Sequence, residues 1–237
     1  MPTVLITGAN RGLGLEFARQ YSDDGWRVIA CCRTPGQADE LRVLATTHDQ
    51  LVIERLDVTD FVAIEALGEK YRDEPIDLLL NNAGIIGKAP LVEHIAGQHF
   101  GTVDYEVWQE VIRTNTFAPV KMAETFLDNV AMSAQKKIVT ISSVVASISE
   151  MMTPGVCYAS SKTALNRAMT IVADKLKDRG IIVAMFCPGY VKTDMDVWGH
   201  ATVEIEESIS ALRPLIAGLT IENTGSFSGH DGRTIGW

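Results

Sequence analysis

Short apolar runs alternate along the whole chain with longer segments whose apolar residues recur at helical spacing. The apolar runs predict strands at 4–7, 27–32, 51–56, 76–80, 137–141 and 181–186. The segments between them predict helices at 13–23, 36–46, 60–73, 104–130, 158–178 and 203–218. Most strand segments are nearly continuous Val, Ile and Leu, as expected for strands covered on both faces. This alternation predicts an α/β fold with a doubly wound, mostly parallel sheet and helices on both faces.

The chain has the size and composition of one globular domain. It has 237 residues, of which 46% are hydrophobic and 22% charged, close to the average of folded soluble proteins. No repeat, linker or low-complexity tract divides it, so we predict a single domain over residues 1–237. A Gly-rich tail at 224–232 could carry a short last strand.

The charge balance excludes several classes of partner. There are 21 Lys and Arg against 30 Asp and Glu, a formal net charge of −9, which disfavours nucleic acids and anionic membranes as partners. No apolar run approaches the ~20 residues that span a bilayer, and no basic region precedes the first apolar run. The four cysteines and five histidines lack metal-ligand spacing. We therefore expect a cytoplasmic protein without a metal.

The first predicted strand leads directly into a glycine-rich loop and then a helix. The loop reads Thr7-Gly8-Ala9-Asn10-Arg11-Gly12-Leu13-Gly14. Glycines let the backbone turn tightly and approach a pyrophosphate, and the N–H groups at the helix start bind that anion. The alternative is an ordinary Gly-rich connection, but the strand–loop–helix context favours a Rossmann-type dinucleotide site.

The end of the second predicted strand indicates which dinucleotide binds. An NAD site places an Asp or Glu there, about 20 residues beyond the glycines, to hold the ribose 2′-hydroxyl. Here Cys32 stands at that position and Arg33 follows. Arg33 can grip a 2′-phosphate through its fork of N–H donors, and Arg11 could add a second cation. Alternatively, both arginines are solvated surface residues. We predict NADP(H) as the cofactor.

A tyrosine and a lysine lie four residues apart where the fifth predicted helix begins. This spacing places Tyr158 and Lys162 on one helical face, one turn apart. Free tyrosine titrates near ~10, too high for efficient proton exchange at neutral pH. A nearby lysine cation stabilises the phenolate and lowers that pKa. Taken alone, the pair is weak evidence, because such surface pairs arise often by chance.

Further motifs follow in a fixed order and cover nearly the whole chain. They are the glycine loop, Asp57-Val58, Asn81-Asn82-Ala83-Gly84, Asn115, Ile141-Ser142-Ser143, Tyr158-x-x-x-Lys162 and Pro188-Gly189-Tyr190-Val191-Lys192-Thr193. With these motifs the sequence resembles the short-chain dehydrogenase/reductase family. It is most similar to the small cytosolic carbonyl reductases related to the sniffer and C-factor proteins. The Asn-Arg pair in the glycine loop and the tail at 227–237 carry that closer similarity.

The resemblance implies a catalytic role for four residues. Tyr158 would donate a proton to a carbonyl oxygen, or remove one from an alcohol. Lys162 would lower the pKa of Tyr158 and bind the nicotinamide ribose. Ser143 would hold the substrate oxygen where negative charge develops, and Asn115 would hold a water that connects Lys162 to solvent. Neighbouring strand residues point to opposite faces, so Ser142 is expected to pack or hydrogen-bond locally instead.

The same matching implies the rest of the cofactor site. Asp57 and Val58 would contact the adenine end, and Pro188, Gly189, Val191 and Thr193 the nicotinamide end. The positions expected to bind the cofactor are Gly8, Asn10, Arg11, Gly12, Leu13, Gly14, Arg33, Asp57, Val58, Asn82, Ala83, Gly84, Tyr158, Lys162, Pro188, Gly189, Val191 and Thr193. Individually, Asp57 could cap the following helix and Pro188-Gly189 could only turn the chain.

A short connection after Thr193 predicts an open substrate pocket. Besides Ser143, its wall would include Met151, Met152, Val191 and Trp198, suited to aromatic or aliphatic aldehydes, ketones and alcohols. Such Met and Trp residues could equally be simple packing. Cys157, next to Tyr158, could be an oxidation-sensitive site or a buried inert thiol.

Two broader questions stay open at this point. By analogy with the family, helices 104–130 and 158–178 would form a homodimer or homotetramer. A rival function is an NADP(H)-binding signalling or redox-sensor protein without catalysis, which the full set of Ser143, Tyr158, Lys162 and Asn115 disfavours. The chain length disfavours a sugar epimerase or dehydratase. The sequence does not indicate the physiological substrate or the favoured direction.

Overall fold

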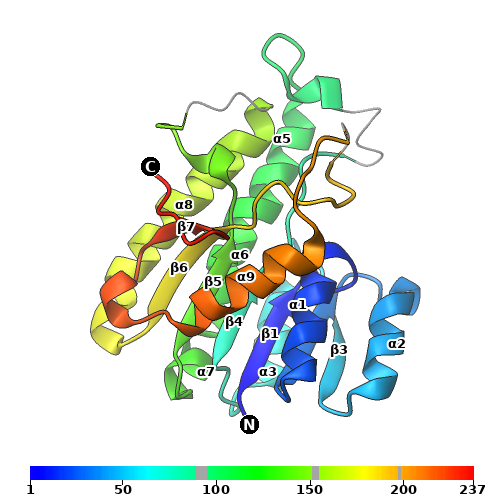
Figure 1. Cartoon of the computed structure of the whole chain (residues 1–237), viewed down its shortest axis with the longest axis vertical. Helices are drawn as coiled ribbons and strands as arrows, with labels where there is room; N and C mark the ends of the chain where they lie inside the picture. Colours follow the sequence, from blue (N-terminus) through cyan, green and yellow to red (C-terminus); the bar gives the residue numbers. More distant parts are fainter. Residues whose placement is uncertain (89–94, 151–154, 197–198) are drawn as a thin grey trace.

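A seven-stranded sheet forms the centre of the molecule, and every strand in it is parallel to its neighbours. A computed structural model describes residues 1–88, 95–150, 155–196 and 199–237. The sheet order is β3-β2-β1-β4-β5-β6-β7 (Figure 1). The strands are β1 Thr3–Thr7, β2 Arg27–Cys32, β3 Leu51–Arg55, β4 Leu78–Asn81, β5 Lys137–Ile141, β6 Ile182–Cys187 and β7 Phe227–Gly229. The predicted α/β fold and the short last strand in the tail are therefore confirmed.

The helices lie between consecutive strands, as the sequence pattern predicted. They are α1 Gly12–Asp23, α2 Asp39–Thr47, α3 Phe61–Lys70, α5 Tyr105–Ile112, α6 Ala118–Thr125, α7 Leu127–Met132, α8 Val156–Leu176 and α9 Ile205–Ala217. No helix in these described parts of the chain is both long and apolar enough to cross a membrane.

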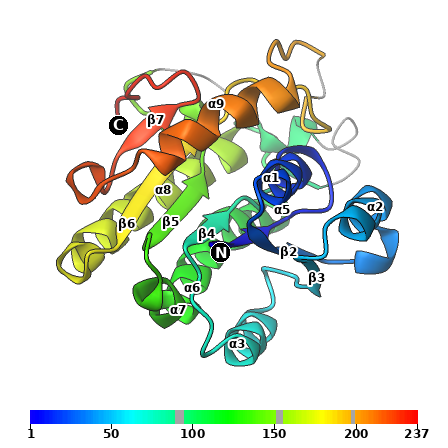
Figure 2. The same ribbon diagram turned by 60° about the horizontal axis from the view of Figure 1, so that its bottom comes forward.

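The sheet is covered on both faces, with a separate core on each. Side chains of β1 alternate between the two, since Leu5 packs with α3, α6 and α8 while Val4 and Ile6 pack with α1, α2 and α9. Figure 2 shows these two helix layers on opposite sides of the strands. Because both faces are buried, strands made almost entirely of Val, Ile and Leu are stable here.

The helix predicted at 104–130 is not continuous, so this prediction is wrong. The segment 104–130 forms α5, then a π-helical turn over Arg113–Phe117, then α6 and α7. Pro119 lies in the first turn of α6, and proline has no N–H to donate to the carbonyl of Asn115, four residues earlier. A wide turn at this point, rather than a regular helix, follows from that missing donor.

The chain passes from one half of the sheet to the other after β3, so that β4 lies beside β1. Strands β1, β2 and β3 extend the sheet in one direction, while β4 to β7 extend it in the other. At such a switch point the loops beyond the strand ends diverge and leave a crevice, which is where open α/β sheets bind ligands. The glycine loop after β1 opens onto this crevice.

Candidate active site

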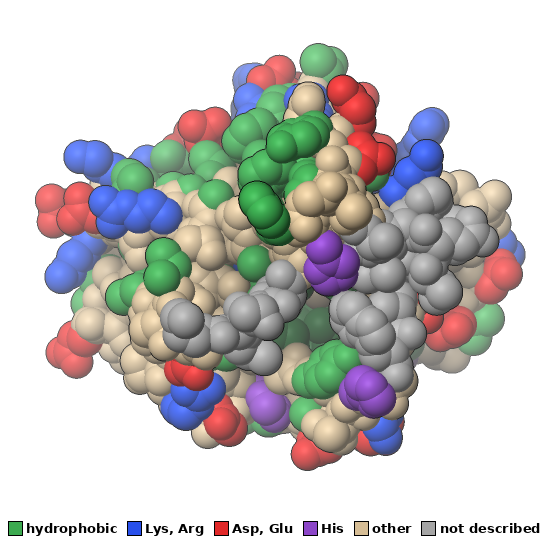
Figure 3. Space-filling view, turned by 90° about the horizontal axis from the view of Figure 1, so that it is seen from above, with side chains coloured by type: hydrophobic (Ala, Val, Ile, Leu, Met, Phe, Trp, Pro, Cys, Tyr) green, Lys and Arg blue, Asp and Glu red, His purple; other side chains and the backbone are tan. Residues whose placement is uncertain are grey.

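A cleft of about 2120 Å³ runs across the carboxyl ends of the strands. Figure 3 looks onto this end and shows the surface hollowed near its centre, with hydrophobic side chains at depth. Every residue predicted to bind the cofactor lines this cleft: Gly8, Asn10, Arg11, Gly12, Leu13, Gly14, Arg33, Asp57, Val58, Asn82, Ala83, Gly84, Tyr158, Lys162, Pro188, Gly189, Val191 and Thr193. These positions therefore lie along one continuous cleft.

The glycine loop has the geometry of an anion cradle. Gly8 has a φ of +69°, in the left-handed region that favours glycine. A Cβ on Gly14 would lie 2.2 Å from the Gly8 carbonyl oxygen, so only glycine fits there. No side chain caps the N-terminus of α1, which leaves its first N–H groups for a ligand. The loop therefore fits a dinucleotide pyrophosphate.

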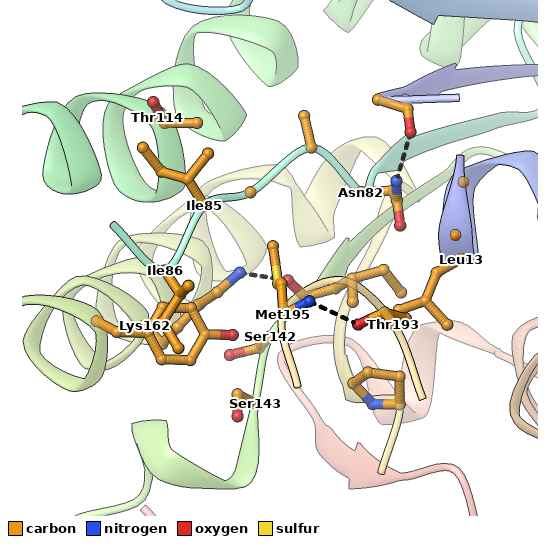
Figure 4. Close-up of a pocket in the computed structure, with 18 of the residues that line it drawn as sticks. Leu13, Asn82, Ile85, Ile86, Thr114, Ser142, Ser143, Lys162, Thr193 and Met195 are labelled. Atoms are coloured by element: carbon orange, nitrogen blue, oxygen red, sulfur yellow. Dashed lines mark hydrogen bonds between the residues drawn. The ribbon is translucent and has the colours of Figure 1, made fainter. Parts of the chain in front are cut away.

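Asn82 ties the loop after β4 to the glycine loop. Its Nδ2 donates to the carbonyl oxygens of Thr7 at 2.9 Å and Gly8 at 3.2 Å. The hydroxyl of Thr7 in turn accepts from the backbone N–H groups of Asn82 and Ala83 at 3.1 and 3.0 Å. In Figure 4 Asn82 and Leu13 lie at the same side of the pocket. These bonds hold the two loops in a fixed relation under the cofactor site.

The two arginines proposed to bind a 2′-phosphate have different surroundings. Arg33 is exposed, and within the described residues its guanidinium has no ion pair or hydrogen bond. Arg11 forms an ion pair with Asp194 across the cleft, and both side chains are exposed. Cys32, at the position of an NAD-binding carboxylate, is buried. Among the described residues, Arg33 is thus a cleft-lining cation that no acidic side chain neutralises.

Asp57 does not cap the following helix. Its Oδ1 accepts from the Thr59 N–H at 2.9 Å and from the Thr59 hydroxyl at 2.7 Å. The helix cap is Asp60, whose side chain accepts from the Ala63 N–H. The capping alternative for Asp57 is thus excluded, while Asp57 itself lines the cleft.

Tyr158 and Lys162 lie on one face of α8, in its first two turns. The Nζ of Lys162 is buried, lies 5.8 Å from the Tyr158 ring centroid and donates to the Ile141 carbonyl oxygen at 2.9 Å. Figure 4 shows Lys162 with this bond, near the end of β5. The arrangement predicted from the four-residue spacing is present.

The pKa of Tyr158 is shifted upwards, whereas the sequence predicted that Lys162 would lower it. Burial, the largest effect, raises the pKa of Tyr158 to about 12; the Cys187 thiol raises it further, and a hydrogen bond with Ser143 lowers it. Lys162 does not lower the pKa of Tyr158 in the protein alone. Burial lowers the pKa of Lys162 to about 8, with Cys187 acting in the opposite direction. In the protein alone, the phenol is therefore a neutral acid.

Ser142 and Ser143 separate as strand alternation predicted. The hydroxyl of Ser142 is buried and donates to Asn166 Oδ1 at 2.6 Å, on the side of α8. The hydroxyl of Ser143 faces Tyr158 and accepts weakly from the Val145 N–H at 3.4 Å. Ser143 is thus the serine that can reach a substrate oxygen beside the phenol.

Asn115 sits in the π-helical turn and fixes the loop after β4. Its Oδ1 accepts from the Ile85 N–H at 2.9 Å, and its Nδ2 donates to the Ile85 carbonyl at 2.8 Å and to the Ser161 hydroxyl at 3.0 Å. Asn115 Oδ1 and Lys162 Nζ both lie within 3.5 Å of the position a Cβ on Gly84 would take. The side-chain amide of Asn115 therefore links the loop after β4 to Ser161 of α8, beside Lys162.

The turn after β6 borders the same cleft from the other side. Gly189 has a φ of +89°, and the imidazole of His230 packs against it, since a Cβ there would lie 2.7 Å from His230 Cε1. The Pro188 carbonyl accepts from the buried Ser208 hydroxyl at 2.6 Å. The tail after β7 therefore supports the turn expected to hold the nicotinamide.

Part of the expected substrate wall lies outside the described residues, and the sequence did not indicate some of the residues that line the cleft. Met151, Met152 and Trp198, expected at the substrate wall, lie outside the described residues. Cys157 is completely buried, and burial raises the pKa of its thiol, which favours the inert reading. Within the described ranges no group of three or more His, Cys, Asp or Glu could hold a metal. The cleft is also lined by residues that the sequence did not single out: Gln98, Cys187, Asp194 and His230.

Comparison with known proteins identifies the family. Residues 2–201 match the family described as short chain dehydrogenase. The chain belongs to this family. It is 31% identical over 245 residues to the 1-hydroxy-2-glutathionyl-2-methyl-3-butene dehydrogenase of Rhodococcus sp. (strain AD45), with all of both chains covered.

Two solved structures show how far the similarity of this short-chain dehydrogenase extends. The carbonyl reductase Sniffer of D. melanogaster has a TM-score of 0.89 at 28% identity, covering 100% of both chains. An NADPH-bound carbonyl reductase from chicken fatty liver has a TM-score of 0.89 at 32% identity, covering 100% of this chain and 99% of that one. The whole fold, including the tail beyond residue 201, is shared with these enzymes.

Proposed function

We propose that this protein is an NADP(H)-dependent oxidoreductase that reduces small carbonyl compounds or oxidises the corresponding alcohols. One observation carries the proposal: Ser143, Tyr158 and Lys162 meet in a cleft whose opposite end presents the unpaired Arg33. The similarity to carbonyl reductases, one of them NADPH-bound, supports it. We take residues 1–237 as a single cofactor-binding domain.

Different residues of the cleft would bind different parts of the cofactor. The uncapped N-terminus of α1 and the glycine loop would hold the pyrophosphate. Arg33 would hold the 2′-phosphate, where Cys32 offers no carboxylate to repel it. Pro188, Gly189, Val191 and Thr193 would hold the nicotinamide end. When bound, the nicotinamide supplies the hydride, and the protein supplies alignment.

The phenol of Tyr158 is the group placed to move a proton. With its pKa raised to about 12 by burial, it is protonated at neutral pH and can donate to a carbonyl oxygen. Ser143, beside it, would donate a hydrogen bond to the same oxygen as negative charge develops. The Lys162 ammonium would stabilise the phenolate left after transfer, since the site is desolvated and the charge is close.

The proton lost by Tyr158 must be replaced from solvent. Asn115 holds the Ile85 backbone and the Ser161 hydroxyl in place beside Lys162. Its backbone carbonyl, to which Pro119 has no N–H to donate, would bind a water that hands protons on to Lys162. Asn115 would therefore act through position rather than through its side-chain amide.

The remaining expectations are part of the same proposal. Aldehydes, ketones and alcohols are the proposed small-molecule partners, with neither nucleic acid nor membrane involved. A cytoplasmic location rests on the sequence, and a homodimer or homotetramer on analogy alone. A sensor without activity is the second candidate, and the complete proton-transfer group weighs against it.

The proposal is tested by following NADPH absorbance with a panel of aldehydes, ketones and quinones. We expect oxidation of NADPH with several aromatic and aliphatic carbonyls and a much weaker reaction with NADH. If purified, folded protein binds NADPH but turns over no member of the panel, the sensor function replaces the reductase.

The pH dependence of the reaction should report Lys162. Its pKa of about 8 means that the ammonium is complete below that pH and is lost above it. We expect kcat/KM for NADPH, which reports groups of the free enzyme, to fall as pH rises through about 8. Tyr158, with a pKa of about 12, stays protonated over the same range. The Lys162→Arg variant should lose this alkaline limb, because arginine stays charged. A wild-type profile that is flat across this pH contradicts the assignment.

A further inference from the structure

A buried hydrogen bond joins the end of β5 to α8, one helical turn beyond Lys162. The hydroxyl of Ser142 donates to Asn166 Oδ1 at 2.6 Å, and each of the two residues is 2% exposed. Ser142 lines the cleft and directly precedes Ser143, whereas Asn166 is not among the residues that line the cleft. The proposed reaction gives neither Ser142 nor Asn166 a role.

Asn166 lies on the same face of α8 as the proposed proton-transfer pair. Tyr158, Lys162 and Asn166 follow one another at intervals of four residues, so their side chains lie one turn apart on one face. The Nζ of Lys162 donates to the carbonyl of Ile141, and Asn166 accepts from the next residue, Ser142. Two successive turns of the helix are therefore bonded to two successive residues at the end of the strand.

The position of Ser143 depends on the residues that flank it. Within the described residues its hydroxyl accepts from a backbone N–H at 3.4 Å, a long and weak bond that fixes little. On one side, Ser142 is held by Asn166; on the other, the N–H of Val144 donates to Cys187 Sγ at 3.1 Å. Figure 4 shows Ser142 and Ser143 together near the end of β5. The bond to Asn166 is thus one of the anchors of the segment that carries Ser143.

The side chain of Asn166 is unfavourable for stability alone. Within the described residues its Nδ2 is inaccessible to water and has no hydrogen-bond partner. A buried N–H group without an acceptor is destabilising, so an apolar side chain of similar shape would suit the core better. Residues that break such a rule are expected where function requires them. The hydrogen bond that Asn166 does make points to Ser142 as the reason.

We propose that Asn166 is a positioning residue that acts through Ser142 to hold Ser143 beside Tyr158. Small displacements of groups that must meet one reacting atom cost up to about 10²-fold in rate. Loss of the bond should therefore lower kcat. The affinity for NADPH should not change, because the glycine loop and Arg33 lie on other elements. The inference rests on the proposed reductase function and adds a residue to it.

A double-mutant cycle of Asn166→Leu and Ser142→Ala tests the inference. We expect each single variant to lower kcat for a good aldehyde about tenfold, the typical value of one neutral hydrogen bond. The double variant should also be about tenfold slower than wild type, because both changes remove the same bond, whereas independent effects would multiply to about 100-fold. The Kd for NADPH, measured by fluorescence titration, should stay near the wild-type value in all three variants.

Thermal stability separates a positioning role from a structural one. Ser142→Ala leaves the buried carboxamide of Asn166 without any partner and should lower the Tm. The double variant removes that carboxamide as well, so its Tm should return to the wild-type value or exceed it, while its kcat stays low. If kcat recovers together with the Tm, the bond serves only the fold and the inference is overturned. Where a single variant does not fold, the Tm and kcat of the double variant still decide.

Two further variants assign the effect to this hydroxyl. Ser142→Thr keeps a hydroxyl and should retain most of the wild-type kcat. Ser133→Ala removes another buried hydroxyl, which donates to the Val130 carbonyl outside the cleft, and should leave kcat unchanged.

Three other outcomes contradict the inference. Wild-type kcat in either single variant would mean that the bond does not position Ser143. A loss of about 100-fold in the double variant would mean that Asn166 and Ser142 act separately. A wild-type enzyme that turns over no aldehyde or ketone overturns the reductase function together with this inference.

Discussion

Replacing Tyr158 with phenylalanine should lower kcat for carbonyl reduction by about 10²- to 10⁴-fold, the range typical of a lost general acid. The phenol is the proposed proton donor; it lies beside Ser143, and its raised pKa keeps it protonated at neutral pH. Phenylalanine keeps the ring that fills the wall of the cleft and removes only the hydroxyl. The effect should therefore appear in kcat, measured with saturating NADPH and a good aldehyde substrate.

The binding of NADPH separates this loss from a structural one. Tyr158→Phe should still bind NADPH with near-wild-type affinity in a fluorescence titration. Tyr21→Phe is the matched control, since Tyr21 is a buried tyrosine of α1 that does not line the cleft, and it should retain full activity. A Tyr158→Phe enzyme that reduces aldehydes at the wild-type rate would mean that another group delivers the proton.

The second large effect is expected at Arg33. An arginine–phosphate contact is charge-assisted, and losing one costs about 10- to 100-fold in affinity. Arg33→Asp should therefore raise the KM for NADPH by at least that factor, because the new carboxylate also repels the 2′-phosphate. The same carboxylate can accept from a ribose 2′-hydroxyl, so the KM for NADH should fall.

The neighbouring strand offers a control for net charge. Arg55, at the end of β3, is exposed and is not among the residues that line the cleft. Arg55→Asp makes the same change in net charge and should leave both KM values nearly unchanged. If Arg33→Asp behaves like Arg55→Asp, the 2′-phosphate is held elsewhere. Arg11 would then be the remaining cation, once its pair with Asp194 opens.

The fold and the location of the site were predictable because they depend on local patterns. Uninterrupted Val, Ile and Leu runs identified buried strands, and their parallel order placed all the motif residues at one edge of the sheet. The glycine at position 14 is required by contact with Gly8 in the same loop. Such interactions join residues that are close in the sequence, so a few adjacent positions are enough to predict them.

What the sequence did not predict depends on contacts between distant segments. Arg11 is paired with Asp194, 183 positions away, and no local pattern indicates that partner. Burial from several elements reverses the expected shift in the pKa of Tyr158. Gln98 carries no motif, and only its packing against Gly155 brings it to the cleft.

The break in the helix at 104–130 illustrates a third limit. Helical periodicity continues through Asn115, so the pattern alone predicts one helix. Only Pro119 signalled an interruption, and proline in a first helical turn is ordinary. The wide turn places Asn115 where it bonds to Ile85 and Ser161, which are contacts that helical periodicity does not indicate.

That wide turn also bears on how the protein can change over time. A π-helical turn holds one residue more than an α-helical one, and each residue adds about 100° of rotation. The side chains of α5 and α6 are therefore out of phase with each other, and Asn115 sits at the offset. Its orientation depends on the number of residues between the two helices and on the missing N–H of Pro119. Substitutions at the other positions of the turn can leave the position of Asn115 unchanged. Loss or gain of one residue in the turn would instead rotate Asn115 away from Lys162.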